Sequence, residues 1–200
     1  MNKLGKILIN LGIFLIILSS SLFTYNLYKE QQAITKSQET LNILKKDLSL
    51  NEEKIINIKE PIDYVKEMDT INIDGFDYLG TITIPNLGLE LPIISEYQYN
   101  RLDIAPCRYY GSIYTNDLII CAHSYKNFFK NIIKLEQKDQ VIFTDVSSNI
   151  YLYEVLEVEI LDQKDISGMI DNEFDLTLYT CTDDGLRRIA VRCNRVYNYV

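Results

Sequence analysis

Residues 176–193 read LTLYTCTDDGLRRIAVRC, and this stretch decides the fold because it describes two apolar strands joined by a tight turn. Side chains alternate between the two faces of a strand. The leucines of the first strand and the Ile and Val residues of the second then form one apolar face, which we expect to face the core. Cys181 and Arg188 fall on the opposite face of their strands.

Asp184-Gly185 is typical of a two-residue hairpin turn, which needs positive φ at both positions. Counting outward from this turn predicts three cross-strand pairs: Asp183 with Leu186, Thr182 with Arg187, and Cys181 with Arg188. Partners that face each other directly have Cβ atoms about 4.5–5.5 Å apart. The turn therefore predicts that a guanidinium lies beside a thiol.

Short apolar runs separated by turn residues fill the chain from Tyr78 onward. They are Leu79–Ile84, Leu89–Ile94, Leu118–Ala122, Gln140–Thr144, Ile150–Ile160, Asp175–Cys181 and Arg188–Val196. Seven or eight strands at this spacing predict one all-β barrel or sandwich. The one helical pattern within this region covers Tyr125–Ile133.

The composition narrows the class of protein. Two hundred residues suit one domain with an appendage. A net charge of −8 argues against a nucleic-acid binder, because such proteins rely on Lys and Arg contacts to phosphate. Four cysteines without a CxxC pair provide no zinc-ligand set, and we expect three of the four to be buried.

The N-terminus predicts a membrane anchor. Lys3 and Lys6 precede an apolar run over residues 7–23, which is long enough to cross a bilayer. A cleaved signal peptide is the competing interpretation. The lysines place the N-terminus in the cytoplasm and the rest of a single-pass protein outside. We expect an anchor at 1–25, a solvated helical stalk or linker at 26–60 and the all-β domain at 61–200; too few heptads are present for a coiled coil.

The chain has one histidine, His123, at the end of the apolar strand that begins at residue 117. A histidine in such a place can be purely structural. Next to Cys181 it would deliver the proton that a leaving amine needs, while the thiolate attacks a carbonyl. Arg188 would stabilise the oxyanion, although the pattern alone also allows an ordinary exposed arginine, with Arg187 and Arg192 as competitors.

These residues resemble those of the sortase family. Thr177–Cys181 is similar to its TLxTC signature, Ala122-His123 and Arg188 match the positions of its histidine and arginine, and residues 84–93 resemble its IPxLxLxLPI strand pair. The resemblance covers about residues 75–200.

What the resemblance implies is an eight-stranded β-barrel at the outer surface of a Gram-positive cell membrane. Such an enzyme cleaves an LPxTG-like sorting signal through a Cys181 thioester and transfers the surface protein to a peptidoglycan amine. We expect Ala122 and Thr180 to contact the substrate. We expect no cofactor and no metal, and we interpret the acidic residues between Asp162 and Asp175 as a solvated loop rather than a calcium site.

Four features of the sequence bear on the subclass. Ala122 stands where many sortases have Gly, and the separation of seven residues from Cys181 to Arg188 is short. The segment from Glu159 to Asp175 is too short for the helical insert of class B. No lid-like Asp-Pro-aromatic motif of class C precedes the domain, and a class D-like enzyme is favoured.

The sequence leaves two alternative functions. A papain-like cysteine protease would use the same residue types, but it has its nucleophile early in the chain and its histidine downstream, on a mixed fold. A non-catalytic surface-binding module would tolerate the loss of Cys181.

Overall fold

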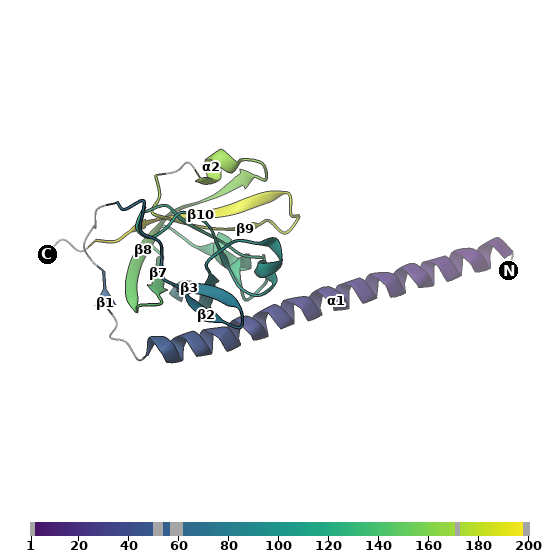
Figure 1. Cartoon of the computed structure of the whole chain (residues 1–200). Coiled ribbons are helices and arrows are strands. Elements are labelled where there is room, and N and C mark those ends of the chain that lie inside the picture. Colours follow the sequence, from purple (N-terminus) through teal and green to yellow (C-terminus); the bar gives the residue numbers. More distant parts are fainter. Residues whose placement is uncertain (1–2, 50–53, 57–61, 171–172, 198–200) are drawn as a thin grey trace.

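The computed structural model describes residues 3–49, 54–56, 62–170 and 173–197. Its elements, in chain order, are α1 (Lys3–Leu48), β1 (Lys54–Ile55), β2 (Ile71–Ile73), β3 (Phe76–Ile84), η1 (Pro85–Leu87), β4 (Leu89–Ile94), η2 (Tyr99–Asp103), β5 (Cys107–Tyr110), β6 (Leu118–Cys121), η3 (Phe129–Lys134), β7 (Gln140–Asp145), β8 (Asn149–Asp162), α2 (Ile166–Ile170), β9 (Leu176–Cys181) and β10 (Arg187–Arg195). Figure 1 shows a barrel with one long helix extending from it.

Eight strands of the described chain form a closed barrel. They pair in the order β3–β4–β5–β6–β9–β10–β8–β7, and β7 pairs with β3 to complete the ring. The β4–β5 and β6–β9 pairs are parallel, whereas the other pairs of the ring are antiparallel. The short β1 and β2 add to the barrel beside β8 and β3. The predicted all-β, eight-stranded barrel is confirmed.

Gly80 allows the barrel to close. It adopts a φ of 144°, beside a register shift in the pairing of β3 with β4. A Cβ at this position would lie 1.9 Å from the backbone oxygen of Thr144 on β7. Only glycine combines this backbone conformation with so close an approach, so β3 can bend and hydrogen-bond to β7 as well as β4.

The core has two layers. Inside the barrel lie the apolar faces of its strands together with Phe128, Phe129 and Ile132 from the segment around η3. A second cluster lies on the outer surface of β4, β5 and β6 and includes Ile94, Cys107 and Cys121, which β2, η2 and α1 cover. This outer layer brings η2 and α1 close to the end of β6, where His123 follows.

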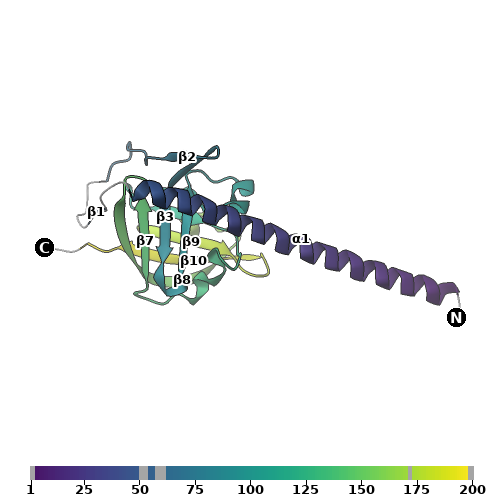
Figure 2. The ribbon, with the colours of Figure 1, turned by 90° about the horizontal axis from the view of Figure 1, so that it is seen from below.

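The C-terminal half of α1 packs against the barrel, which corrects the expectation of a solvated stalk. Ala33, Ser37, Thr40 and Leu44 are buried, at a spacing that puts them on one face of the helix. Figure 2 shows α1 following the side of the barrel before it extends away. Burying one leucine is worth about 1.5–3 kcal/mol. This half of α1 is therefore part of the domain; the predicted boundary at 60/61 lies outside the described residues.

The N-terminal half of α1 is exposed and apolar. Its large hydrophobic side chains from Ile7 to Tyr28 are mostly solvent-exposed. By length and composition this helix can cross a membrane. The same test is also passed by a signal sequence, so the helix agrees with both interpretations of the N-terminus.

Candidate active site

Cys181 is the accessible thiol of this chain. It ends β9 and is half-buried, whereas Cys107, Cys121 and Cys193 are buried, as predicted for three of the four. Burial raises the pKa of Cys107 to about 12 and also raises those of Cys121 and Cys193. Because the thiolate is the nucleophile, those three cysteines are unsuited to attack a carbonyl.

His123 follows β6, which pairs in parallel with β9. Cys121 is the register partner of Tyr179, and the Ala122 N–H donates to the Tyr179 carbonyl at 3.2 Å. Two residues further along both strands, His123 comes alongside Cys181. Cys121 and Tyr179 belong to the outer cluster, so alternation places His123 and Cys181 on the same outer face.

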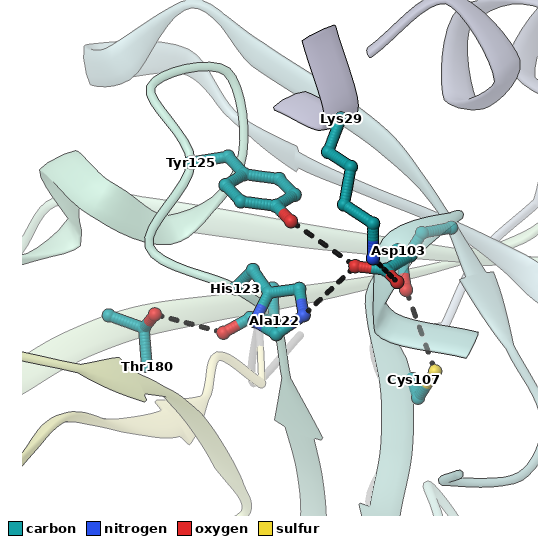
Figure 3. Close-up of polar contacts among 8 residues, drawn as sticks. Lys29, Asp103, Cys107, Ala122, His123, Tyr125 and Thr180 are labelled. Carbon is teal, nitrogen blue, oxygen red and sulfur yellow. Dashed lines mark hydrogen bonds and ion pairs between the residues drawn. The ribbon is translucent and has the colours of Figure 1, made fainter. Parts of the chain in front are cut away.

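Ala122 and Thr180 have buried side chains, and their predicted contact with the substrate stays a prediction. Both are buried, because their side chains alternate with those of His123 and Cys181 and point into the barrel. The Thr180 hydroxyl donates to the Ala122 carbonyl at 2.9 Å (Figure 3). This bond ties the end of β6 to the end of β9, next to His123 and Cys181.

The register of the hairpin is as predicted, but its turn is different. Cys181 pairs with Arg188, and the Thr182 N–H donates to the Arg187 carbonyl at 3.0 Å. Among the described residues of the turn, positive φ occurs at Gly185 and not at Asp184. The Gly185 N–H closes a turn on the Thr182 carbonyl at 2.8 Å, which matches a turn followed by a left-handed glycine.

The three arginines of β10 that were candidates for the oxyanion partner have different surroundings. Arg188, opposite Cys181, is partly buried, and its Nη1 donates to the Arg187 carbonyl at 3.1 Å. Arg187 is exposed on the other phase of the strand. Arg192 is 1% exposed and pairs with Glu159 at 2.6 Å, so its guanidinium is committed to the fold. Arg188 is therefore the arginine that remains on the Cys181 face.

Asp103, at the end of η2, was missed by the sequence analysis. Its Oδ1 lies 3.4 Å from His123 Nε2 and accepts a hydrogen bond from the Tyr125 hydroxyl at 3.2 Å. Its Oδ2 pairs with Lys29 Nζ of α1 at 3.2 Å. Figure 3 shows these three side chains converging on one carboxylate. No local pattern links residue 103 to residue 123, because the contact depends on how η2 packs outside the barrel.

The surroundings of His123 shift its pKa in opposite directions. Burial lowers the pKa of His123, and the nearby Lys29 ammonium adds to this, while the Asp103 carboxylate opposes both. Rings stand close to the imidazole on two sides, with centroids at 5.6 Å for Tyr99 and 4.9 Å for Tyr125. A histidine favoured in its neutral form can accept and return a proton near neutral pH.

A cavity of about 250 Å³ adjoins this face of β9 and β10. Its lining residues are Tyr97, Tyr109, Asp162, Gln163, Asp165, Ile166, Met169, Tyr179 and Arg188. The rings of Tyr97, Tyr109 and Tyr179 meet edge to face, with successive centroids 5.4 Å apart. A larger hollow of about 640 Å³ lies between α1 and the barrel, but the smaller cavity contains Arg188 and is therefore the better candidate for the acyl substrate.

Across the described residues, no group of three or more His, Cys, Asp or Glu side chains is arranged to hold a metal ion. The prediction that the enzyme needs neither metal nor cofactor stays a prediction.

A closed β-barrel with an accessible cysteine beside a histidine and an arginine is the arrangement of a cysteine acyl-transfer enzyme. Comparison with known families agrees, because the sortase domain matches residues 82–196. This is more than half of the chain, and the protein therefore belongs to the sortase family. It is a cysteine transpeptidase, as the members of that family are.

Solved structures show the same fold. Sortase C1 from Streptococcus agalactiae is 24% identical, with 64% of this chain and 72% of that chain covered and a TM-score of 0.54. A sortase D5 transpeptidase from Clostridium perfringens is 18% identical, with 83% and 99% covered and a TM-score of 0.56. A lid mutant of sortase A from Corynebacterium diphtheriae is 19% identical, with 81% and 94% covered and a TM-score of 0.55. No match was found among curated protein sequences.

Proposed function

We propose that this sortase joins surface proteins to the cell wall by cleaving an LPxTG-like sorting signal and transferring the acyl group to a peptidoglycan amine. Family membership implies a sorting signal and an amine acceptor as the two substrates. The observation that carries the residue assignment is the position of Cys181. It is the accessible cysteine of the chain, and the backbone pairing seats it beside His123 and opposite Arg188.

The reaction has two steps. In the first, His123 takes the proton of the Cys181 thiol, and the thiolate forms a bond to the scissile carbonyl carbon. The C–N bond then breaks, and His123 gives that proton to the leaving amine. In the second, the acceptor amine attacks the thioester, the C–S bond breaks, and His123 takes up the proton that the amine loses. The Arg188 guanidinium stabilises the oxyanion that forms in both steps.

The apolar half of α1 supports anchoring in the cell membrane. Residues 7–23 would form the single span, with Lys3 and Lys6 on the cytoplasmic side and the barrel outside. In the described part of the connection from β8 to β9 the one helix is the five-residue α2, which is consistent with the class D-like assignment rather than with the helical insert of class B. The papain-like alternative does not fit a closed barrel.

The proposed activity is tested by mixing the purified full chain with an LPxTG-type peptide library and a primary amine, and by following products by mass spectrometry. We expect a fragment cut within the motif and a new amide between its carboxyl group and the added amine. A Cys107→Ala variant should give the same products, because Cys107 is buried. Products that persist in a Cys181→Ala variant would remove the assignment. No product from any motif would favour the non-catalytic binding module.

A further inference from the structure

We propose that Asp103 positions His123 for proton transfer, and that Lys29 of α1 competes for the same carboxylate and so couples the membrane-proximal helix to the histidine. The effect on turnover rests on the proposed function. The coupling between the three side chains does not, and it can be measured by itself.

The Asp103 carboxylate is held from three sides. Oδ1 faces both His123 Nε2 and the Tyr125 hydroxyl, and Oδ2 faces Lys29 Nζ. The backbone of η2 is fixed because Leu102 is buried in the outer cluster. Burial raises the pKa of Tyr125 to about 12, so this phenol stays a neutral donor near pH 7. The carboxylate is therefore well placed to orient the imidazole.

The contact selects one ring nitrogen. With Nε2 directed to Asp103, Nδ1 is the nitrogen that can exchange a proton with the reacting groups. A carboxylate that bonds to the far nitrogen of a histidine fixes the tautomer of the imidazole and stabilises its protonated form. Asp103 does not line the cavity beside Arg188 and would act through His123, so its role is positional.

The helix α1 contacts both sides of the histidine segment. Lys29 pairs with Asp103, and Glu30 Oε1 accepts a hydrogen bond from the Lys126 N–H at 2.7 Å, three residues after His123. The Lys29 side chain is 44% exposed and the hollow beside it contains Asp103, so this ion pair can open. A shift of α1 relative to the barrel would change how much of the carboxylate is available to His123.

The charged and titratable groups around His123 come from every element packed against it. They are Lys29 and Glu30 of α1, Tyr99 and Asp103 of η2, Tyr125 after β6, and Cys181 and Arg188 of the hairpin. Of these, Asp103 raises the pKa of His123 and Lys29 lowers it. Removing each in turn should therefore move the pKa of His123 in opposite directions.

The single histidine makes the test direct. In the full chain, held in detergent micelles and labelled with ¹³C-histidine, the only imidazole signal belongs to His123. We expect its pKa to fall in Asp103→Asn and to rise in Lys29→Met. The matched control is Lys45→Met, which removes another ion pair between α1 and the barrel, to Glu90, away from the site. This control should leave the pKa of His123 unchanged.

Activity provides the second readout. The limb of the kcat/KM profile that follows His123 should move to lower pH in Asp103→Asn and to higher pH in Lys29→Met. Asp103→Asn should lose turnover by less than the roughly 10²–10⁴-fold that general acid–base catalysis supplies in total. Asp103→Glu should recover part of the loss. A merely structural residue would reduce activity without moving the profile.

Three results would overturn the proposal. They are an unchanged His123 pKa in Asp103→Asn, a Lys29→Met variant that behaves as Lys45→Met does, and a shift of the same sign in both site variants. If Asp103→Asn does not fold, Tyr125→Phe replaces it. That variant removes a competing donor from Oδ1 and should raise the pKa of His123, as Lys29→Met does. An unchanged or lowered pKa in Tyr125→Phe would then overturn the proposal. Activity remaining in Cys181→Ala would refute the proposed function, but the titration would still test the coupling.

Discussion

Cys181 is held by backbone pairing on two sides. Its neighbour β6 brings His123 along one edge of β9, and β10 brings Arg188 along the other. Pairing of this kind tolerates changes in the side chains themselves, because the hydrogen bonds come from the main chain. Substitutions at the three positions should therefore report on chemistry more than on folding.

Cys181→Ala should abolish both cleavage and transfer of an LPxTG-type peptide, because no other accessible thiol lies in the described chain. His123→Ala should be nearly as damaging, since the chain has no second histidine. Both variants should keep the circular dichroism spectrum and the melting temperature close to those of the wild type. More than a few per cent of residual turnover in either variant would contradict the cysteine mechanism.

Arg188→Ala should reduce turnover by about 10²–10³-fold or more, the usual cost of losing one oxyanion donor. Arg188→Lys should recover little, because an ammonium lacks the planar fork of the guanidinium. Arg187→Ala serves as the matched control and should keep most of its turnover. Steady-state kinetics on the three variants provide the measurement. Exchanged behaviour of the two alanine variants would mean that Arg187 is the oxyanion partner.

Arg192→Ala should lose activity for a different reason, because it should destabilise the fold. Its guanidinium is buried and bonded to Glu159, Thr177 Oγ1 and the carbonyls of Gly168 and Met169. Glu159 is 36% exposed and can be hydrated, but each buried neutral group left without its partner costs about 1–3 kcal/mol. We expect a matching drop in the free energy of unfolding, measured by urea denaturation. A stable variant with impaired catalysis would return Arg192 to the list of oxyanion candidates.

At the scale of elements, the sequence predicted correctly the strands and the hairpin register, which depend on residues close together in the chain. The seven apolar runs are all strands, because alternation and turn residues act within a few positions. The hairpin register followed from its glycine, although the turn uses one left-handed residue instead of two. The predicted register was correct despite the different turn, because the leucines of β9 and the Ile and Val of β10 must face the same core.

The elements that were missed depend on distant contacts. The β5 strand is four residues long, with a polar and aromatic sequence that shows no apolar run. The five-residue α2 is too short to show a helical period. The expected helix at Tyr125–Ile133 is a 3₁₀ segment that covers Phe129–Lys134. Asp103 and the buried face of α1 were missed for the same reason, because only packing brings them to the barrel.

Alanine substitutions at two glycines compare the cost of backbone strain in the hairpin turn with the cost of blocking the close approach of β3 to β7. Gly185→Ala should cost about 1–2 kcal/mol, the price of left-handed backbone, because the space around Gly185 is open. Gly80→Ala should cost at least about 3 kcal/mol, because its Cβ would overlap the Thr144 carbonyl. Chemical denaturation measures both losses. Equal losses would mean that the approach of β3 to β7 does not control closure.

At the scale of the whole molecule, α1 joins an exposed apolar half to a half that packs on the barrel. The full chain should fractionate with membranes, and deletion of residues 1–25 should give a soluble, active domain that keeps Ala33, Leu44 and Lys29. Fractionation and peptide turnover test this. A native mature protein cut just after residue 23 would instead show that the apolar run is a signal peptide.

The central claim is that Cys181 forms the acyl-enzyme, and one measurement tests it most directly. The full chain is mixed with an LPxTG-type peptide without an added amine, quenched in acid, and digested for peptide mass spectrometry. We predict a thioester to the N-terminal part of the motif on the peptide that contains Cys181, released by hydroxylamine and absent from Cys181→Ala. Cleavage of the motif with acylation at another residue, or without any acylation, would contradict the account.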